Sequence, residues 1–210
     1  MTRRILIVTH HFPPSTVAAS FRPLRLAKYL PELDYRVWVV SATAGSYPSG
    51  RTDLQLNNEL PKSVCVTRVP NFNPLISYER RRPPSEPDSK SIDKPKIPNV
   101  KGFMAELFKF PDIDAPWAMA SVALSLYIVL RNRIDVIYTS APPFGAHLLG
   151  LALKKLTGKP WIAHYGNPWT DNPSISWNCR LFKRGCERLD RAIVRNADAV
   201  LVLDDILANC

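Results

Sequence analysis

The regular alternation of short apolar, β-branched runs with helix-patterned segments constrains this chain more than any other feature. Residues 5–9 (ILIVT) have the character of a strand that is covered on both faces. A helix is expected over residues 20–30, with Ser20 as its N-cap and Pro23 in its first turn, where a missing N–H does no harm. A second strand is expected over residues 36–40, so this first stretch forms one βαβ unit.

The same alternation continues to the end of the sequence. Further strands are expected at residues 63–69, 135–139, 160–164 and 199–203, and further helices at 101–110, 117–131, 144–157 and 179–196, with Gly158 ending the third of these helices. A proline-rich, polar stretch at about 70–98 is expected to be a surface insertion, because the α/β pattern resumes after it. The pattern predicts an α/β fold: a Rossmann-like, doubly wound parallel sheet in a single domain over residues 1–210.

The amino-acid composition indicates which kind of partner the chain binds and in which compartment it is expected. Apolar residues make up 46% of the sequence and charged residues 22%, as in an ordinary globular protein, but the formal net charge of +10 favours an anionic partner. The four cysteines lack metal or redox spacing and are interpreted as reduced thiols of a cytoplasmic protein. No apolar run is long enough to cross a bilayer, so any membrane contact is expected to be peripheral, at the inner membrane face.

Ligands of parallel α/β sheets bind outside the carboxyl ends of the strands, and this rule selects three loops: residues 10–16, 140–144 and 164–171. The first loop opens a helix, whose N–H groups and dipole favour a phosphate-like anion. It lacks both the dinucleotide and the Walker glycine patterns, so an ordinary βα turn is the alternative. The third loop is the richest in polar and aromatic groups, and a loop held only by Trp169 packing is its alternative.

Histidines occur at these expected strand ends. His10, His11 and His164 follow or end strands, and His147 begins a helix. Strand alternation predicts that His10 and His11 point to opposite sides, so that they do not face one ligand together. No pair of carboxylates accompanies them, so no metal site is expected. Three histidines at the ligand edge favour a functional role over a purely structural one.

The last expected helix carries a stripe of arginines opposite an apolar face. The stripe consists of Arg180, Arg184, Arg188, Arg191 and Arg195. Its functional interpretation is contact with an anionic membrane surface or an acidic partner, and its alternative is a solvated outer face partly neutralised by Glu187 and Asp190. Gly185 weakens the middle of the helix. No nucleic-acid motif accompanies the charge, so nucleic acid is not expected as a partner.

Several segments in order resemble the amino-terminal domain of family 4 glycosyltransferases, which have the GT-B fold. The matching segments are residues 5–8 with 11–14 (HFPP), 110–112 (FPD) with Trp117, 135–140 (DVIYTS) with 142–143 (PP), 160–163 (PWIA), 167–169 (NPW) and 197–201 (ADAVL). Two segments depart from the family pattern. Ser15-Thr16-Val17 stands where glycines are usual, and His164-Tyr165-Gly166-Asn167 stands where close relatives have Asp-Phe-Arg-Asp.

The resemblance implies a two-domain enzyme that transfers a sugar from a nucleotide-sugar with retention of configuration and without an obligatory metal cofactor. This chain would be its acceptor-side half, and the donor-binding domain is expected to be absent from it. By the same resemblance His11, Ser15 and Thr16 lie in the loop near the donor diphosphate, and Arg22 begins the helix behind it. His164 would orient or deprotonate an acceptor hydroxyl, with Asn167, Trp169 and Asp171 in the same cleft.

The expected function is therefore acceptor binding, for a polysaccharide or lipid-linked acceptor, by a domain that is inactive alone. Two alternatives remain open. One is a non-enzymatic GT-B half that acts as a partner subunit. The other is an unrelated Rossmann-like nucleotide-binding module, which predicts tight nucleotide binding by this chain alone.

Overall fold

A computed structural model describes residues 2–47, 50–73, 110–170, 172 and 179–203 of the chain. The strands are β1 (Arg3–Thr9), β2 (Tyr35–Ala42), β3 (Cys65–Val69), β4 (Val136–Ala141), β5 (Trp161–Tyr165) and β6 (Ala199–Val202). The α-helices are α1 (Phe21–Tyr29), α4 (Ala115–Arg131), α5 (Gly145–Thr157) and α6 (Arg180–Asn196). Short 3₁₀ turns are η1 (Ala18–Ser20), η2 (Leu30–Leu33), η3 (Ala44–Ser46) and η4 (Leu54–Glu59).

The strands form one six-stranded sheet in the order β3-β2-β1-β4-β5-β6, and every neighbouring pair is parallel. The expected parallel α/β sheet is therefore confirmed, and each expected strand appears within a residue or two of its expected bounds. Chain order reverses between β1 and β4, and this is the point at which doubly wound sheets bind their ligands.

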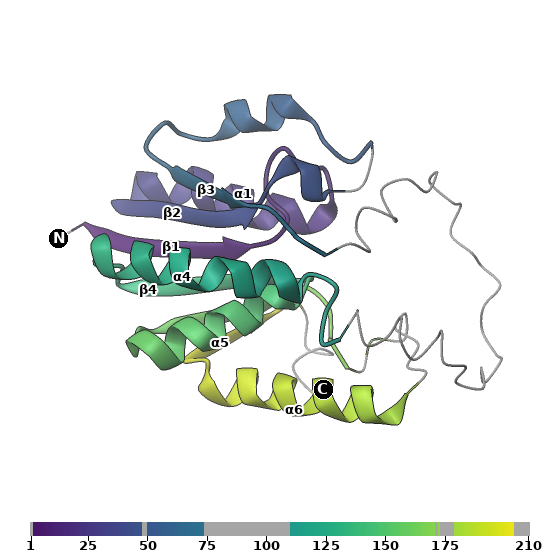
Figure 1. Ribbon diagram of the computed structural model, residues 1–210. Coiled ribbons are helices and arrows are strands. Elements are labelled where there is room, and N and C mark those ends of the chain that lie inside the picture. The colour runs from purple at the N-terminus through teal and green to yellow at the C-terminus, as the bar shows by residue number, and fades with distance from the viewer. Residues whose placement is uncertain (1, 48–49, 74–109, 171, 173–178, 204–210) are drawn as a thin grey trace.

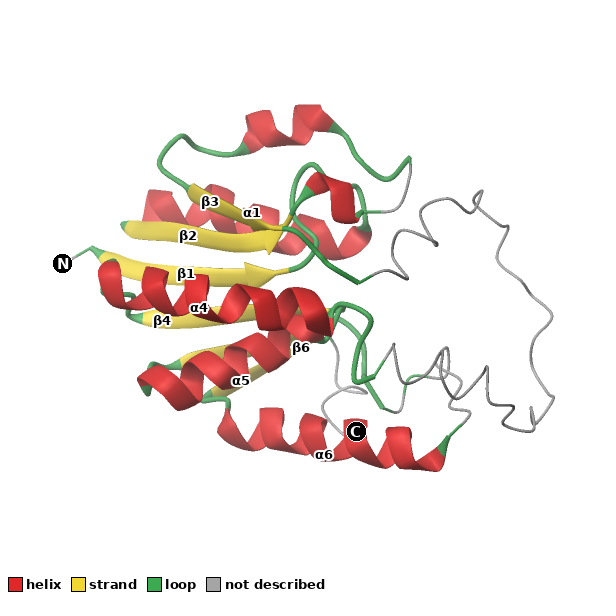
Figure 2. Ribbon diagram, in the orientation of Figure 1, coloured by secondary structure: helices red, strands yellow, loops and turns green. Residues whose placement is uncertain are grey.

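Helices cover the two faces of the sheet, as Figures 1 and 2 show. Ile5 and Ile7 of β1 pack with Ala27 of α1, whereas Leu6 and Val8 belong to the larger core under α4, α5 and α6. This alternation follows from the two-residue period of a strand. It confirms the doubly wound architecture and places α4, α5 and α6 together in one layer.

Helix ends agree with the sequence fully in one case and in part in another. Gly158 ends α5 with a φ of 66°, a left-handed conformation that favours glycine, as expected. Ser20 occupies the N-cap position of α1 as expected, but its side chain makes no capping hydrogen bond, because the turn η1 precedes α1 and gives Ser20 helical backbone angles. Its hydroxyl instead donates within the loop, to the carbonyl of Ser15 or Val17, each at 2.7 Å.

Gly185 of α6 has a packing role that its helix propensity does not suggest. A Cβ atom at this position would lie 2.8 Å from the ring of Phe110, which also packs on Phe182 at 5.4 Å between ring centroids. The glycine therefore lets an aromatic ring seat directly on the helix. The expected helix at 101–110 lies outside the described residues except for Phe110, as does most of the proline-rich stretch at 70–98. Among the described helices, none has the length and apolarity that crossing a membrane requires.

Candidate functional site

A pocket of about 680 Å³ opens at the carboxyl ends of β4 and β5, beside the beginning of α1. It therefore lies at two of the three loops that the strand-end rule selects. Its polar lining side chains are Arg22, Arg25, Ser140, His164 and Asn167. The rest of the lining is apolar or glycine: Val17, Ala18, Ala19, Phe21, Ala141, Pro142, Gly166 and Leu203.

Arg22 and His164 meet in the wall of this pocket. The Arg22 guanidinium contacts His164 Nε2, and Ser140 Oγ lies 3.2 Å from His164 Nδ1. A guanidinium only donates, so Nε2 must accept, and the proton of the neutral imidazole is placed on Nδ1, from which it is donated to Ser140. Both ring nitrogens of His164 are thus engaged, and the histidine holds Arg22 against the end of β5.

Burial, with the nearby Arg22 charge, lowers the pKa of His164 to about 4. Its ring also stacks on Tyr138, with 6.1 Å between centroids and 10° between the planes. His164 is therefore neutral at neutral pH and is a weak base there. This arrangement favours orientation of a ligand through Arg22 over removal of a proton by the imidazole.

Gly166 forms the floor between the β4 and β5 loops. Its N–H donates to the carbonyl of Ala141 at 2.8 Å, and a Cβ atom would lie 2.9 Å from that same oxygen. No larger residue fits without moving backbone. The departure from the family pattern at residue 166 therefore shapes the pocket wall.

The loop after β1, in contrast, is closed on itself. Ser15 is fully buried, and its N–H donates to Phe12 while that of Thr16 donates to Arg51. The Arg68 guanidinium binds the carbonyl of Pro13 from the other side. The N–H groups of Ser15 and Thr16 are thus already used within the protein, and neither residue lines the pocket.

The residues of the third loop are divided between pocket and core. Asn167 lines the pocket, whereas Trp169 is buried and stacks on Phe144 with ring centroids 4.9 Å apart. This is the packing alternative that the sequence left open for Trp169. Asp171 lies outside the described residues.

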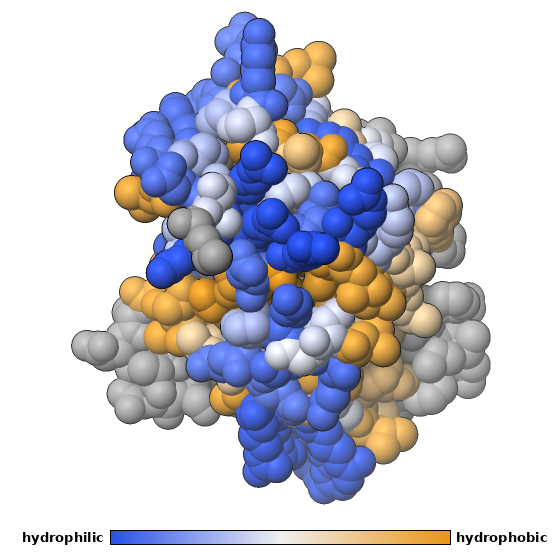
Figure 3. Space-filling view, turned by 90° about the vertical axis from the view of Figure 1, so that its left-hand side faces the viewer, coloured by the Kyte–Doolittle hydropathy of each residue, from blue (hydrophilic) through white to orange (hydrophobic). Residues whose placement is uncertain are grey.

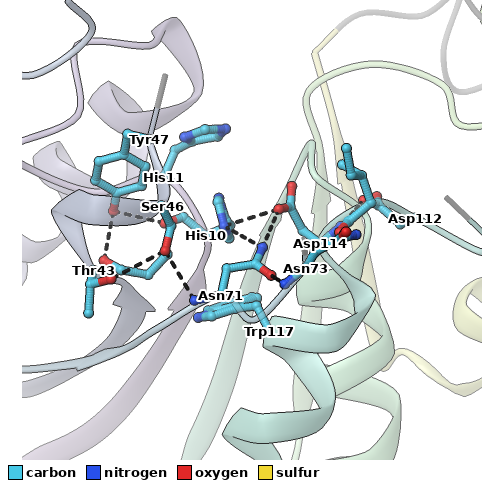
Figure 4. A network of polar contacts seen from close by, with 12 residues as sticks. His10, His11, Thr43, Ser46, Tyr47, Asn71, Asn73, Asp112, Asp114 and Trp117 are labelled. Carbon is cyan, nitrogen blue, oxygen red and sulfur yellow. Dashed lines mark hydrogen bonds and ion pairs between the residues drawn. The ribbon is translucent and has the colours of Figure 1, made fainter. Parts of the chain in front are cut away.

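A second polar cluster lies at the end of β1, on the side of α4 (Figure 4). His10 Nε2 lies 3.2 Å from Asp114 Oδ1, and Asn71 donates to the same oxygen at 2.6 Å. Burial holds the pKa of His10 well below 6.5, so the histidine is neutral and donates a hydrogen bond to the carboxylate. We call these three residues the His10 network.

His10 and His11 do not point to opposite sides, contrary to expectation. β1 ends at Thr9, so strand alternation does not reach them, and their rings meet edge to face at 4.9 Å. His11 Nδ1 is 3.5 Å from the Ser15 hydroxyl, and burial lowers its pKa to about 4. His11 does not line the pocket.

Asp112 connects this cluster with the beginning of α5. Its carboxylate accepts from the N–H of Asp114 at 2.9 Å and from that of Phe144 at 2.6 Å, which ties the start of α4 to the start of α5. The sequence interpretation gave no role to Asp114, Asn71 or Arg25. An acidic residue just before the expected helix at 117–131 suggests an N-cap, but Asp114 uses its side chain for His10 instead.

His147 belongs to the core. Trp161 Nε1 donates to Thr139 Oγ1 at 2.9 Å, and His147 Nδ1 lies 2.7 Å from the same hydroxyl oxygen. Burial lowers the pKa of His147 to about 3. This histidine is a structural hydrogen-bonding group between α5 and β4.

The arginine stripe of α6 lies as expected. All five arginines are exposed, and Phe182, Cys186 and Ile193 are buried on the opposite face. Asp190 is not available to neutralise the stripe in full, because it accepts a hydrogen bond from the Tyr165 hydroxyl at 2.7 Å. Within the described residues, no group of three or more histidine, cysteine, aspartate or glutamate side chains could hold a metal ion.

Solved structures align with nearly the whole of this chain. UGT2 of Phytolacca americana, complexed with UDP-2-fluoroglucose and pterostilbene, aligns over 96% of this chain and 48% of its own, with a TM-score of 0.51 and 13% identity. SnogD, a glycosyltransferase from Streptomyces nogalater, aligns over 97% of this chain and 44% of its own, with a TM-score of 0.44 and 17% identity. The chain thus spans about half the length of these proteins. The likeness to UGT2 shows one Rossmann-like half of a GT-B fold.

The family of the chain follows from its sequence. Residues 18–209 match the family described as glycosyl transferase 4-like domain, and the chain belongs to that family. No curated protein sequence matches significantly.

Proposed function

We propose that this domain binds the acceptor of a glycosyltransferase, and that the acceptor carries a phosphate or diphosphate beside an apolar group. The observation that carries the proposal is the composition of the pocket. Arg22 and Arg25 are its charged lining residues, its described lining includes no carboxylate, and apolar side chains make up most of the remainder. A lipid-linked, phosphate-bearing acceptor has this combination of groups.

In this proposal Arg22 is the anion-binding group and His164 is a positioning residue. The imidazole holds the guanidinium at the end of β5, where the beginning of α1 also faces the pocket. Asn167 would contribute an amide to an acceptor hydroxyl. The nucleotide-sugar donor, retention of configuration and the need for a separate donor-binding domain are the parts of the proposal that come from the family resemblance.

Titration calorimetry with geranyl diphosphate and geraniol tests the pocket. The diphosphate should bind and the alcohol should not, because the arginines recognise the anion. Changing both arginines, R22Q/R25Q, should weaken diphosphate binding by about 10-fold or more, since a hydrogen bond to a charged group contributes about 1.5–3 kcal/mol. R36Q is the matched control, because Arg36 is exposed at the opposite end of β2.

Equal binding of geranyl diphosphate by wild type and R22Q/R25Q would overturn the proposed site. UDP serves as the discriminating ligand. Tight binding of UDP by this chain alone would instead support a nucleotide-binding module. Robust sugar transfer from a radiolabelled nucleotide-sugar by these 210 residues would refute the need for a donor domain.

A further inference from the structure

Helix α4 carries no charged residue from Ala115 to Leu130, yet one of its faces is open to solvent. Met119, Tyr127 and Leu130 are 76%, 61% and 63% exposed. Ala120 and Ala123 are exposed on the same face, since these positions follow helical spacing. A helix that is apolar on all sides is normally covered on all sides. We therefore expect another molecule to cover the outer face of α4.

The arginine stripe lies in the same helix layer. α4, α5 and α6 cover one face of the sheet, and α5 packs against both of the others (Figure 2). Leu181, which is 68% exposed, lies among the arginines of α6. The acids of this helix have other partners: Glu187 lies 3.7 Å from Lys183, and Asp190 accepts from Tyr165.

Another exposed apolar side chain lies at one end of this helix layer. Leu156, near the end of α5, is 59% exposed, and α4 and α5 both end next to the amino-terminal ends of the strands. Figure 3 looks at this end of the molecule. It shows hydrophobic residues gathered across the middle, between hydrophilic regions above and below.

We infer that the outer face of the α4–α6 layer docks on an anionic lipid bilayer. The exposed apolar side chains of α4 and the exposed arginines of α6, which lie on either side of α5 in one helix layer, match the two zones of a membrane interface. The apolar groups enter the acyl boundary and the guanidinium groups meet anionic headgroups. Charge complementarity decides the partner, because the net charge of +10 and the exposed arginines oppose association of two copies through this face. The inference is independent of the acceptor pocket.

Vesicle flotation tests the docking face with the chain as it is. The vesicles are phosphatidylcholine alone, or phosphatidylcholine with about 30% phosphatidylglycerol to supply the anionic surface. The chain should float with the anionic vesicles and not with the neutral ones. The substitutions R184Q/R188Q/R191Q should weaken partitioning by at least about 10-fold, and M119S/Y127S/L130S by about 10-fold.

Matched controls separate the docking face from overall charge and hydrophobicity. R36Q/R51Q/K62Q removes three exposed charges from other parts of the surface, and L33S/L54S/F72S removes three exposed apolar side chains from them. Both controls should stay within about twofold of wild type. Circular dichroism confirms that each variant folds. R22Q/R25Q should also float normally, so failure of the acceptor proposal would not affect this one.

Three results would overturn the inference. The first is equal binding to neutral and anionic vesicles, or no binding to either. The second is an equal loss in a control and in its matched docking-face variant. The third is unchanged flotation of M119S/Y127S/L130S together with loss of a dimer in sedimentation velocity, which would assign the α4 face to a second copy of the chain.

Discussion

Two histidines lie at the carboxyl edge of the same sheet, each beside a charged partner, and they differ in almost everything else. His164 meets the exposed Arg22 in the wall of a pocket, whereas His10 meets Asp114 in the interior, where their side chains are 2% and 8% exposed. Both are neutral because burial lowers the pKa of each ring. The difference is that one partner can move into solvent and the other cannot.

This contrast assigns ligand binding to the Arg22–His164 pair and folding stability to the His10 network. Arg22 can turn from His164 to an anionic ligand, because its guanidinium is at the surface of the pocket. Asp114 is a shared acceptor for His10 and Asn71, and removal of one member leaves buried donors without an acceptor. His10 Nδ1 of this network, and Nε1 of Trp117, whose ring packs edge to face on His10, are buried atoms for which the described residues provide no partner. We therefore expect the pocket pair to control ligand affinity and the His10 network to control stability.

Acidification should produce the largest effect. A histidine whose folded pKa is lowered binds its proton more easily when unfolded, so stability is lost as pH falls from 6.5 toward the folded pKa. His11 and His164 have pKa values of about 4 and His147 of about 3, while Asp112, whose pKa burial raises, opposes this loss. A net loss of at least about 3 kcal/mol is expected between pH 7 and 4.5, measured by urea unfolding.

The H164Q variant divides this loss between the two regions. When His164 is protonated, Arg22 can move away from it into the pocket, which relieves the repulsion between the two charges. The interior histidines are buried and have no neighbouring group that can move away in this manner. H164Q should therefore keep most of the acid sensitivity. A flat stability profile in H164Q would show that the pocket, and not the interior, is responsible. Asp198 does not disturb the measurement, because its pKa is lowered and its contribution to the pH dependence of stability therefore falls below the range from pH 7 to 4.5.

The D114A variant should produce the second largest effect. Removing this carboxylate leaves His10 Nε2–H and the Asn71 amide without their shared acceptor, so unfolding free energy should fall by about 2–3 kcal/mol. R22Q, which changes the exposed member of the pocket pair, should cost less than about 0.5 kcal/mol. Both values come from urea unfolding at pH 7. Equal costs would contradict the division between binding and folding.

Much of the fold was predictable from sequence because both faces of the sheet are buried. Continuous apolar runs such as residues 5–8 mark such strands, and Gly158 marks a helix end through its left-handed backbone. The candidate site was predictable only where the strand-end rule acts directly, at the ends of β4 and β5 and the loops that follow, which contribute Ser140, His164 and Asn167. Arg22 came from the resemblance and Arg25 from neither, although one turn of helix brings both to the pocket.

The rest depends on contacts between distant segments. Asn71 and Asp114 are 43 positions apart, and no local pattern predicts their hydrogen bond. Ser15 and Thr16 have a composition that suits an anion-binding turn, but Thr16 donates to Arg51 and Ser15 is bridged to Thr52. Hydrogen bonds between distant segments decide whether a backbone N–H is free for a ligand, and the local sequence pattern does not reveal these bonds.

The smallest effect tests the Arg22–His164 pair itself. R22Q removes the charge that, after burial, lowers the pKa of His164, so this pKa should rise from about 4 by roughly one unit without reaching 6.5. Carbon-detected NMR of the histidine side chains measures it at atomic resolution. R25Q is the control, since Arg25 lines the same pocket but has no recorded contact with His164 among the described residues.

The interior His10 sharpens this result. It should show no change in R22Q, because it does not contact Arg22 and burial is the first cause of its lowered pKa. If the His164 pKa rose equally in R22Q and R25Q, the general positive field of the pocket would be responsible and not the direct contact. His164 would then be a wall residue of the pocket, and the positioning of Arg22 would have to be assigned to α1 alone.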